Sequence, residues 1–237
     1  RGHEPVIHEQ TDHLGGTFIA ASAESYKGKL RDLLTWYRKQ MADLEIEIHY
    51  NEKVESIDPF AGAPVIIATG AVPRVLKKVP GHEKMVEACE YLTGTPVGEK
   101  VAVIGGGMVG CETAEYLAAR GCKVSVIEMM DKIAAGESTT ILPTLLENYK
   151  TYGVEQYPSH KVKEFRMDAV VCENKDGAEV TIPCDYIVLA MGARSNEFDA
   201  AALEAASIPV YSIGDAAGKA ADISNAIRTG YDTACQL

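Results

Sequence analysis

The feature that most constrains the fold is a glycine-rich turn between an apolar stretch and a helix-forming stretch. Residues 100–110 read KVAVIGGGMVG, and a second apolar stretch, VSVI, ends on Glu128 about twenty residues further on. In a βαβ unit Gly105 permits the tight turn, Gly107 lets the backbone approach a pyrophosphate, and Gly110 lets the helix pack closely on the strand. The pattern therefore predicts a dinucleotide-binding βαβ unit, and an ordinary glycine turn in an α/β domain is the alternative.

The chemistry expected of this unit follows from the helix N-terminus and from the acid. The first N–H groups of a helix have no partner inside the helix, and the helix dipole favours negative charge there. Glu128 would accept hydrogen bonds from the adenosine ribose hydroxyls. An acid at this position would repel the 2′-phosphate of NADPH, so NADH is the expected coenzyme. Arg120 and Lys123, just before that strand, would offset the repulsion if they faced the ribose.

The end of the same pattern recurs at the start of the chain. Residues 1–9 read RGHEPVIHE and parallel RGCKVSVIE at 120–128, so Glu9 is expected to be a second ribose-binding acid. Its glycine loop would lie roughly twenty residues upstream, before residue 1. We therefore expect the chain to be a fragment that begins just before the second strand of a nucleotide-binding unit.

The composition limits the functional classes. The formal net charge of −11 argues against nucleic-acid binding, which needs clustered Lys and Arg. No apolar run approaches membrane-spanning length, so we expect no membrane contact and a cytoplasmic location. The six cysteines form no C-x-x-C pair, which predicts free thiols and neither a redox dithiol nor an iron–sulfur or other metal site. His82 and His160 are expected at the surface.

Hydrophobic periodicity and turn residues predict an alternation of strands and helices. Strands are expected at 6–9, 45–49, 63–70, 101–104, 123–128, 186–192 and 210–215, and a β meander at 162–165, 169–173 and 179–183. Helices are expected at 25–43, 108–119 and 138–151, with a last one starting near an N-cap at Asp222. The apolar stretch 63–70 is expected to be a fully buried strand.

The expected fold class is α/β, with two Rossmann-like three-layer units and a small β meander. The first dinucleotide-binding unit would comprise residues 1–95 and 208–237 and would lack its first strand. The NAD-type unit, residues 96–207, would be inserted in it. The Pro- and Gly-rich stretch 71–99 would connect the first unit to the second.

Five segments together resemble a known group of flavoproteins. They are LGG at 14–16, ATGAVPR at 68–74, VIGGGMVGCETA at 103–114, AMGARSN at 190–196 and IGD at 213–215. The chain resembles the C-terminal portion of the 2,4-dienoyl-CoA reductase, 2-enoate reductase and trimethylamine dehydrogenase family, whose members have two dinucleotide-binding domains. The resemblance spans nearly all of the chain.

That resemblance implies two sets of binding residues. NADH would contact Gly105, Gly106, Gly107, Met108, Val109, Gly110, Glu128 and Gly192. FAD would contact Glu9, Gly15, Gly16, Thr69, Gly70, Gly214, Asp215 and Ala226. Glu112 would sit near the nicotinamide, and no side chain is assigned as a general acid or base.

The resemblance also implies a role. The chain would be an electron-transfer module of a larger NADH:flavin oxidoreductase, in which hydride passes from NADH to FAD. An N-terminal barrel of the same protein would carry FMN and a 4Fe-4S cluster, and the protein could form homo-oligomers. The isolated chain is expected to bind FAD poorly and to be inactive. A stand-alone NADH:acceptor oxidoreductase and a non-catalytic ADP-binding structural module are the alternatives.

Overall fold

The computed structural model divides the chain into two compact units. The split unit comprises Arg1–Val72 and Arg194–Leu237, and the inserted unit comprises Pro73–Ala193. The structure describes residues 2–55, 60, 62–92, 94, 98–135, 140–196, 198, 199, 201, 205, 207–218 and 220–237. The expected insertion of one unit in the other is therefore present.

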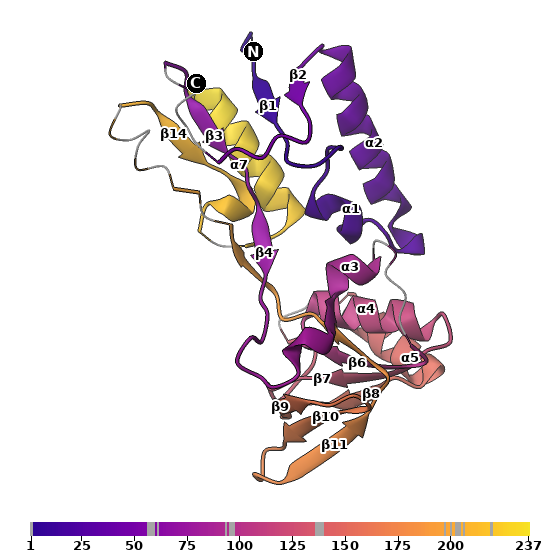
Figure 1. The fold of residues 1–237 in the computed structure, drawn as a ribbon. Coiled ribbons are helices and arrows are strands. Elements are labelled where there is room, and N and C mark those ends of the chain that lie inside the picture. Colours follow the sequence, from indigo (N-terminus) through magenta and orange to yellow (C-terminus); the bar gives the residue numbers. More distant parts are fainter. Residues whose placement is uncertain are drawn as a thin grey trace. The chain divides into compact units, whose positions relative to one another are not determined.

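A five-stranded parallel sheet forms the centre of the inserted unit (Figure 1). Its strands, in spatial order, are β5 (Met85–Glu87), β12 (Tyr186–Leu189), β6 (Lys100–Ile104), β7 (Lys123–Ile127) and β8 (Glu155–Tyr157). β6 lies between β12 and β7, so the turn that follows Ile104 opens at the middle of the sheet edge. Ligands of open parallel sheets bind at this edge, beyond the carboxyl ends of the strands.

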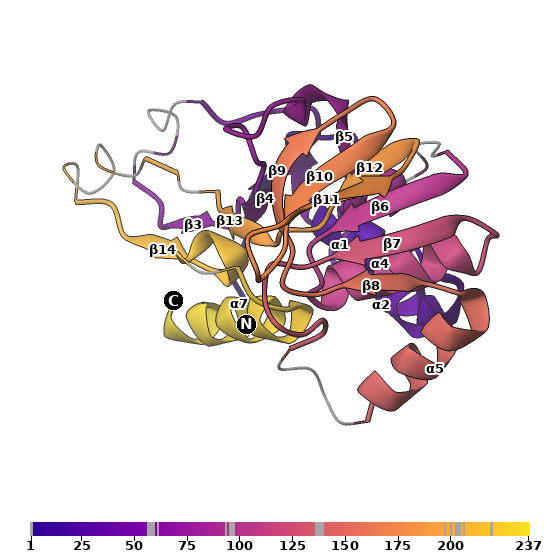
Figure 2. The ribbon, with the colours of Figure 1, turned by 90° about the horizontal axis from the view of Figure 1, so that it is seen from below.

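Helices cover one face of this sheet and the β meander covers the other (Figure 2). The helices are α3 (Ala88–Leu92), α4 (Met108–Ala118) and α5 (Leu142–Tyr152), and a short 3₁₀ turn, η3 (His82–Lys84), precedes β5. The antiparallel meander is β9 (Lys161–Phe165), β10 (Ala169–Glu173) and β11 (Glu179–Pro183). The inserted unit therefore has the expected three layers.

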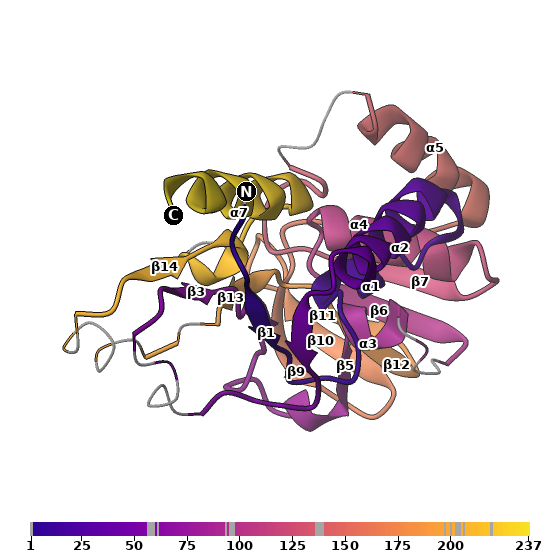
Figure 3. The same ribbon diagram turned by 90° about the horizontal axis from the view of Figure 1, so that it is seen from above.

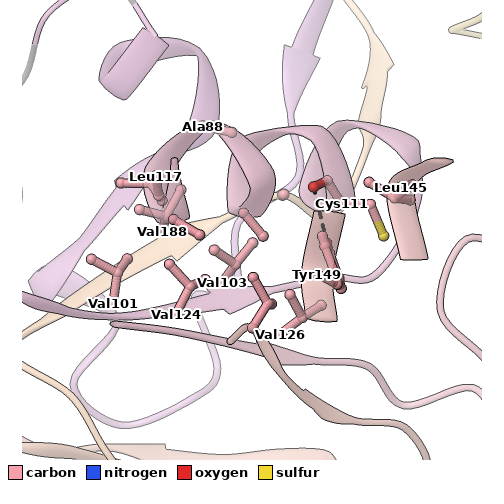
Figure 4. Close-up of a cluster of buried hydrophobic side chains, with 14 of the residues drawn as sticks. Ala88, Val101, Val103, Cys111, Leu117, Val124, Val126, Leu145, Tyr149 and Val188 are labelled. Carbon is pink, nitrogen blue, oxygen red and sulfur yellow. Dashed lines mark hydrogen bonds between the residues drawn. The ribbon is translucent and has the colours of Figure 1, made fainter. Parts of the chain in front are cut away.

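Alternate residues of β6 point into two separate cores because successive side chains of a strand face opposite sides. Val101 and Val103 pack against the helices, and Figure 4 shows them with α4 and α5 side chains. Ala102 and Ile104 pack against the meander. A strand that is buried on both faces is apolar throughout, which explains the unbroken VAVI stretch of the sequence.

The split unit contains two parallel strand pairs, and Figure 3 labels both strands of one pair, β3 and β14. β1 (Val6–His8) pairs with β2 (Glu47–His49), and β3 (Val65–Ile67) pairs with β14 (Val210–Ser212). Its helices are α1 (Thr17–Ala21), α2 (Gly28–Asp43) and α7 (Ile223–Gln236), with 3₁₀ turns η1 (Ser25–Lys27) and η4 (Gly214–Ala216). A further two-stranded sheet joins β4 (Ala71–Pro73) to β13 (Ala193–Ser195).

Two expectations are corrected by the structure, while the expected domain bounds, 1–95 with 208–237 and 96–207, stay a prediction. β5 pairs with β12 and is therefore part of the sheet of the inserted unit. β3 is not fully buried: Ile66 is 42% exposed, since β14 is its only strand partner among the described residues. The strand expected at 45–49 begins at Glu47, because Glu45 is left-handed with φ of 53°.

Candidate nucleotide-binding site

Two glycines of the turn after β6 are required by packing alone. Gly105 has φ of +106°, and a Cβ there would lie 2.3 Å from the carbonyl oxygen of Ala190. A Cβ on Gly110 would lie 1.8 Å from the carbonyl oxygen of Gly105. A turn this tight brings α4 directly against the end of β6. The structure therefore gives these two positions the roles in turn and helix packing that the motif predicts.

Gly107 is different, because nothing in the protein requires it to be glycine. Its φ is −74°, which every residue adopts, and a Cβ there would meet no atom within 4 Å. It is the N-cap of α4 and provides no side-chain cap. The space that a side chain would fill lies over the first N–H groups of the helix, where an anion is favoured.

The carbonyls of the turn point inward, which directs its amides outward. The Gly106 carbonyl accepts from the Ala134 N–H at 2.6 Å and from the Cys111 thiol at 3.4 Å. The Gly107 carbonyl accepts from the Cys111 N–H at 2.9 Å. In a trans peptide the C=O and the following N–H point in opposite directions. The amides of Gly107 and Met108 therefore point away from the protein, toward the open space.

Glu128 closes the other side of this space. One carboxylate oxygen, Oε2, accepts from the Gly106 N–H at 2.7 Å, and the other, Oε1, accepts from the Met130 N–H at 2.8 Å. An ionised carboxylate has about four acceptor positions. Each oxygen therefore keeps capacity for a further donor, as two neighbouring ribose hydroxyls would require.

The end of β1 is built like the end of β7. The N–H of Glu9 donates to the carbonyl of His49 at 2.9 Å, and the N–H of Glu128 donates to the carbonyl of Tyr157 at 2.9 Å. Each acid also accepts from the N–H two residues later, Thr11 for Glu9 and Met130 for Glu128, both at 2.8 Å.

The segments that follow the neighbouring strands, β2 and β8, are also alike. Asn51 and Ser159 are both left-handed, with φ of 56° and 57°. Their N–H groups donate to the carbonyls of Thr11 and Met130 at 2.8 and 2.7 Å. The two units thus share a hydrogen-bonded acid turn, as the parallel between residues 1–9 and 120–128 suggests.

The other expected NADH residues line the same edge or lie on α4. Gly192, with φ of +74°, follows β12, the neighbour of β6. Val109 is 49% exposed in the first turn of α4, and Met108 beside it is half-buried. Glu112 is half-buried one turn further along α4.

The FAD-type residues lie at turns and helix starts of the split unit. Gly16 is left-handed with φ of +46°, and a Cβ there would meet open space, whereas a Cβ on Gly15 would press on Ile19 and Leu34 at 3.0 Å. The Thr69 hydroxyl donates to the carbonyl of Asn196 at 2.6 Å, next to the left-handed Gly70 with φ of +72°.

The expected FAD residues near η4 contact α7 or the segment just before it. A Cβ on Gly214 would lie 3.3 Å from the Cβ of Ala226. Asp215 accepts from the Ala221 N–H at 2.9 Å, and the Asp222 side chain caps α7 by accepting from the Asn225 N–H at 2.7 Å. The N-cap expected at Asp222 is confirmed.

The family follows from a sequence comparison. The model of the pyridine nucleotide-disulphide oxidoreductases matches residues 47–230. The chain belongs to this family. The parallel sheet, the inserted unit and the glycine turn agree with that membership, and the expected kinship with flavoproteins that have two dinucleotide-binding domains is confirmed.

Its relatives include several reductases. The chain is 38% identical to bilirubin reductase of Mediterraneibacter gnavus, over 98% of the chain and 36% of that protein. It is 33% identical to NADH oxidase of Thermoanaerobacter brockii, over 100% of the chain and 38% of that protein. Among solved structures, 2-naphthoyl-CoA reductase matches with a TM-score of 0.90 and 28% identity, over 100% of the chain and 36% of its own length. The chain thus spans little more than a third of these proteins.

Neither a metal-binding cluster nor a membrane-spanning helix is found among the described residues. They contain no group of three or more His, Cys, Asp or Glu side chains that could hold a metal ion. Their helices are all too short or too polar to cross a membrane.

Proposed function

We propose that the inserted unit binds NADH at the turn after β6. The observation that carries this proposal is the open space at Gly107, which no packing contact explains and which lies beside outward-pointing amides. A pyrophosphate fits that space because N–H groups and the helix dipole both favour its charge. Glu128 would bind the adenosine ribose, and Gly192 would line the same edge of the sheet.

NADH is favoured over NADPH by the way in which Glu128 is held. Both carboxylate oxygens already accept from backbone amides, so the side chain cannot swing away from a 2′-phosphate without breaking those bonds. A like charge next to a fixed carboxylate is unfavourable. The relative named NADH oxidase agrees with this preference.

The split unit is proposed to bind FAD. Its acid turn at Glu9 matches the one at Glu128, the open face of Gly16 leaves room for a diphosphate, and α7 starts beside Asp215. When both are bound, NADH supplies a hydride that FAD accepts. The residues of this chain bind and orient the two nucleotides; their backbone amides and acids are the groups offered to the ligands.

We further propose that the chain is the electron-transfer module of a larger cytoplasmic reductase. Relatives named bilirubin reductase and cinnamate reductase suggest an unsaturated, conjugated substrate of the enoate or dienoyl type. The remaining length of such relatives would hold a barrel with FMN and a 4Fe-4S cluster, and homo-oligomers are compatible with this assignment.

Substitution of Gly107 tests the NADH site. Gly107→Ala should leave the melting temperature unchanged, because its Cβ meets no protein atom, and should weaken NADH and ADP-ribose binding at least about tenfold, which corresponds to about 1.4 kcal/mol. Titration calorimetry measures both ligands. Gly230→Ala in α7 is the control and should bind as wild type does. Unchanged affinity in Gly107→Ala would show that the pyrophosphate lies elsewhere.

Anaerobic mixing tests electron transfer separately. The larger reductase proposed above, with its flavin bound, is mixed with NADH while the flavin absorbance is followed. Loss of the oxidised-flavin absorbance supports the proposed role. Retained ADP-ribose binding with no loss of that absorbance would overturn it in favour of a structural nucleotide-binding module.

A further inference from the structure

One buried hydroxyl has no part in the nucleotide contacts just described. Tyr149 lies on α5 and is 1% exposed, and its hydroxyl donates to the carbonyl of Cys111 in the first half of α4 at 2.9 Å (Figure 4). A buried hydroxyl is costly without a partner, and phenylalanine would fill the same volume without that cost. Packing therefore explains the ring of Tyr149 but not its oxygen.

The partner of that hydroxyl is the residue that holds the glycine turn. Cys111 is fully buried, its thiol donates to the Gly106 carbonyl, and its N–H donates to the Gly107 carbonyl. Together with the Ala134 N–H, which also donates to the Gly106 carbonyl, these two bonds turn the carbonyls inward and the amides of Gly107 and Met108 outward. A displacement of Cys111 would therefore rotate both peptides that face the pyrophosphate.

A second bond between the same helices lies further from the turn. The side-chain amide of Asn148 on α5 donates to the carboxylate of Glu115 on α4 at 2.5 Å. Glu115 makes none of the contacts to the glycine turn described above. Of these two α4–α5 hydrogen bonds, only that of Tyr149 reaches Cys111.

We propose that Tyr149 is a positioning residue of the dinucleotide site, which acts through Cys111 to orient the outward amides of the glycine turn. The inference rests on the proposed NADH site and adds a residue outside its sequence motif. Burial raises the pKa of Tyr149, so the hydroxyl stays a donor throughout the physiological range.

The experiment compares Tyr149→Phe with Asn148→Ala. Tyr149→Phe should fold, because the phenylalanine ring fills the same volume of the core. Its affinity for ADP-ribose should fall about fivefold, because the amides of Gly107 and Met108 would no longer be held in one orientation. Asn148→Ala removes the other α4–α5 bond and should keep wild-type affinity. Calorimetry with ADP-ribose is the measurement.

A ligand-free measurement accompanies it. Hydrogen exchange of the Gly107 and Met108 amides, followed by NMR, should change in Tyr149→Phe and not in Asn148→Ala. Equal losses of affinity in both variants would reduce Tyr149 to general helix packing and overturn the inference, as would wild-type affinity and exchange in Tyr149→Phe. Failure of the wild-type chain to bind ADP-ribose would instead refute the NADH site itself.

Discussion

At the scale of single residues, Glu128 has a structural role besides the ribose binding proposed for it. Its two oxygens connect the glycine turn, through Gly106, to the loop after β7, through Met130. A carboxylate accepts on both oxygens, whereas an amide side chain accepts on only one. The acid is therefore needed for the shape of the site before any ribose arrives.

We predict that Glu128→Gln destabilises the ligand-free protein as well as weakening NADH binding. The amide NH₂ must face either the Gly106 or the Met130 N–H, which leaves a donor opposed to a donor at a cost of about 1–3 kcal/mol. Thermal unfolding without ligand measures this. Asp131→Asn, which removes an equal charge from an exposed neighbour, should melt like wild type. A Gln variant as stable as wild type would contradict the prediction.

The sequence predicts which residue types a site needs better than it predicts which main-chain N–H groups hold those residues in place. The glycines at 105 and 110 could be assigned because their roles need the absence of a Cβ, which the motif shows directly. The N–H groups of Met130 and Ala134 could not, because any residue except proline provides the same donor. Tyr149 was missed because it lies on another helix, with no fixed spacing from the motif.

At the scale of elements, α7 depends unusually on its cap. No residue of α7 is fully buried, so packing contributes little to holding this helix, and the Asp222 side chain supplies a partner for one of its first N–H groups. By contrast α4 buries residues along its length and has no side-chain cap.

We predict that Asp222→Ala destabilises the split unit by about 1 kcal/mol, the usual contribution of an N-cap. Asp222→Asn should keep most of the wild-type stability, because asparagine caps a helix nearly as well as aspartate does. Circular dichroism during chemical unfolding provides the measurement. An alanine variant with wild-type stability would show that other contacts hold the start of α7.

Most elements, but not all, could be predicted from periodicity. The helix at 28–43 has a clear repeat of 3.6 residues, and the outer meander strands, β9 and β11, have a repeat of 2 residues. The five-residue helix α1 was missed, since such a length shows little more than one turn of any pattern. The helix expected at 138–151 is observed at Leu142–Tyr152, with Pro143 in its first turn, where proline is favoured; residues 138 and 139 lie outside the described residues.

At the scale of the whole molecule, the two units differ in how much core they contain. Both hydrophobic clusters lie entirely within the inserted unit. In the split unit the buried hydrophobic residues among those described are Ala20, Leu34, Ile67 and Ala216. The place of β5 in the inserted sheet could not be predicted, because β5 joins that sheet through β12, about a hundred residues later in the chain.

We predict two thermal transitions, with the split unit unfolding first. ADP-ribose should raise the midpoint temperature of the second transition only, because a ligand stabilises the unit that binds it. At a ligand concentration of a hundred times the Kd, this stabilisation is about 2.7 kcal/mol. Differential scanning calorimetry with and without the ligand tests this. A single transition that ADP-ribose shifts as a whole would show that the units unfold together.

The inward carbonyls of Gly106 and Gly107 have a consequence for mutational surveys of this family. In the proposed site, main-chain dipoles would recognise the pyrophosphate, so truncating a side chain would remove no group that contacts it. A survey that only shortens side chains would pass over these contacts, whereas a variant that adds atoms, such as Gly107→Ala, or one that turns a peptide plane would reveal them.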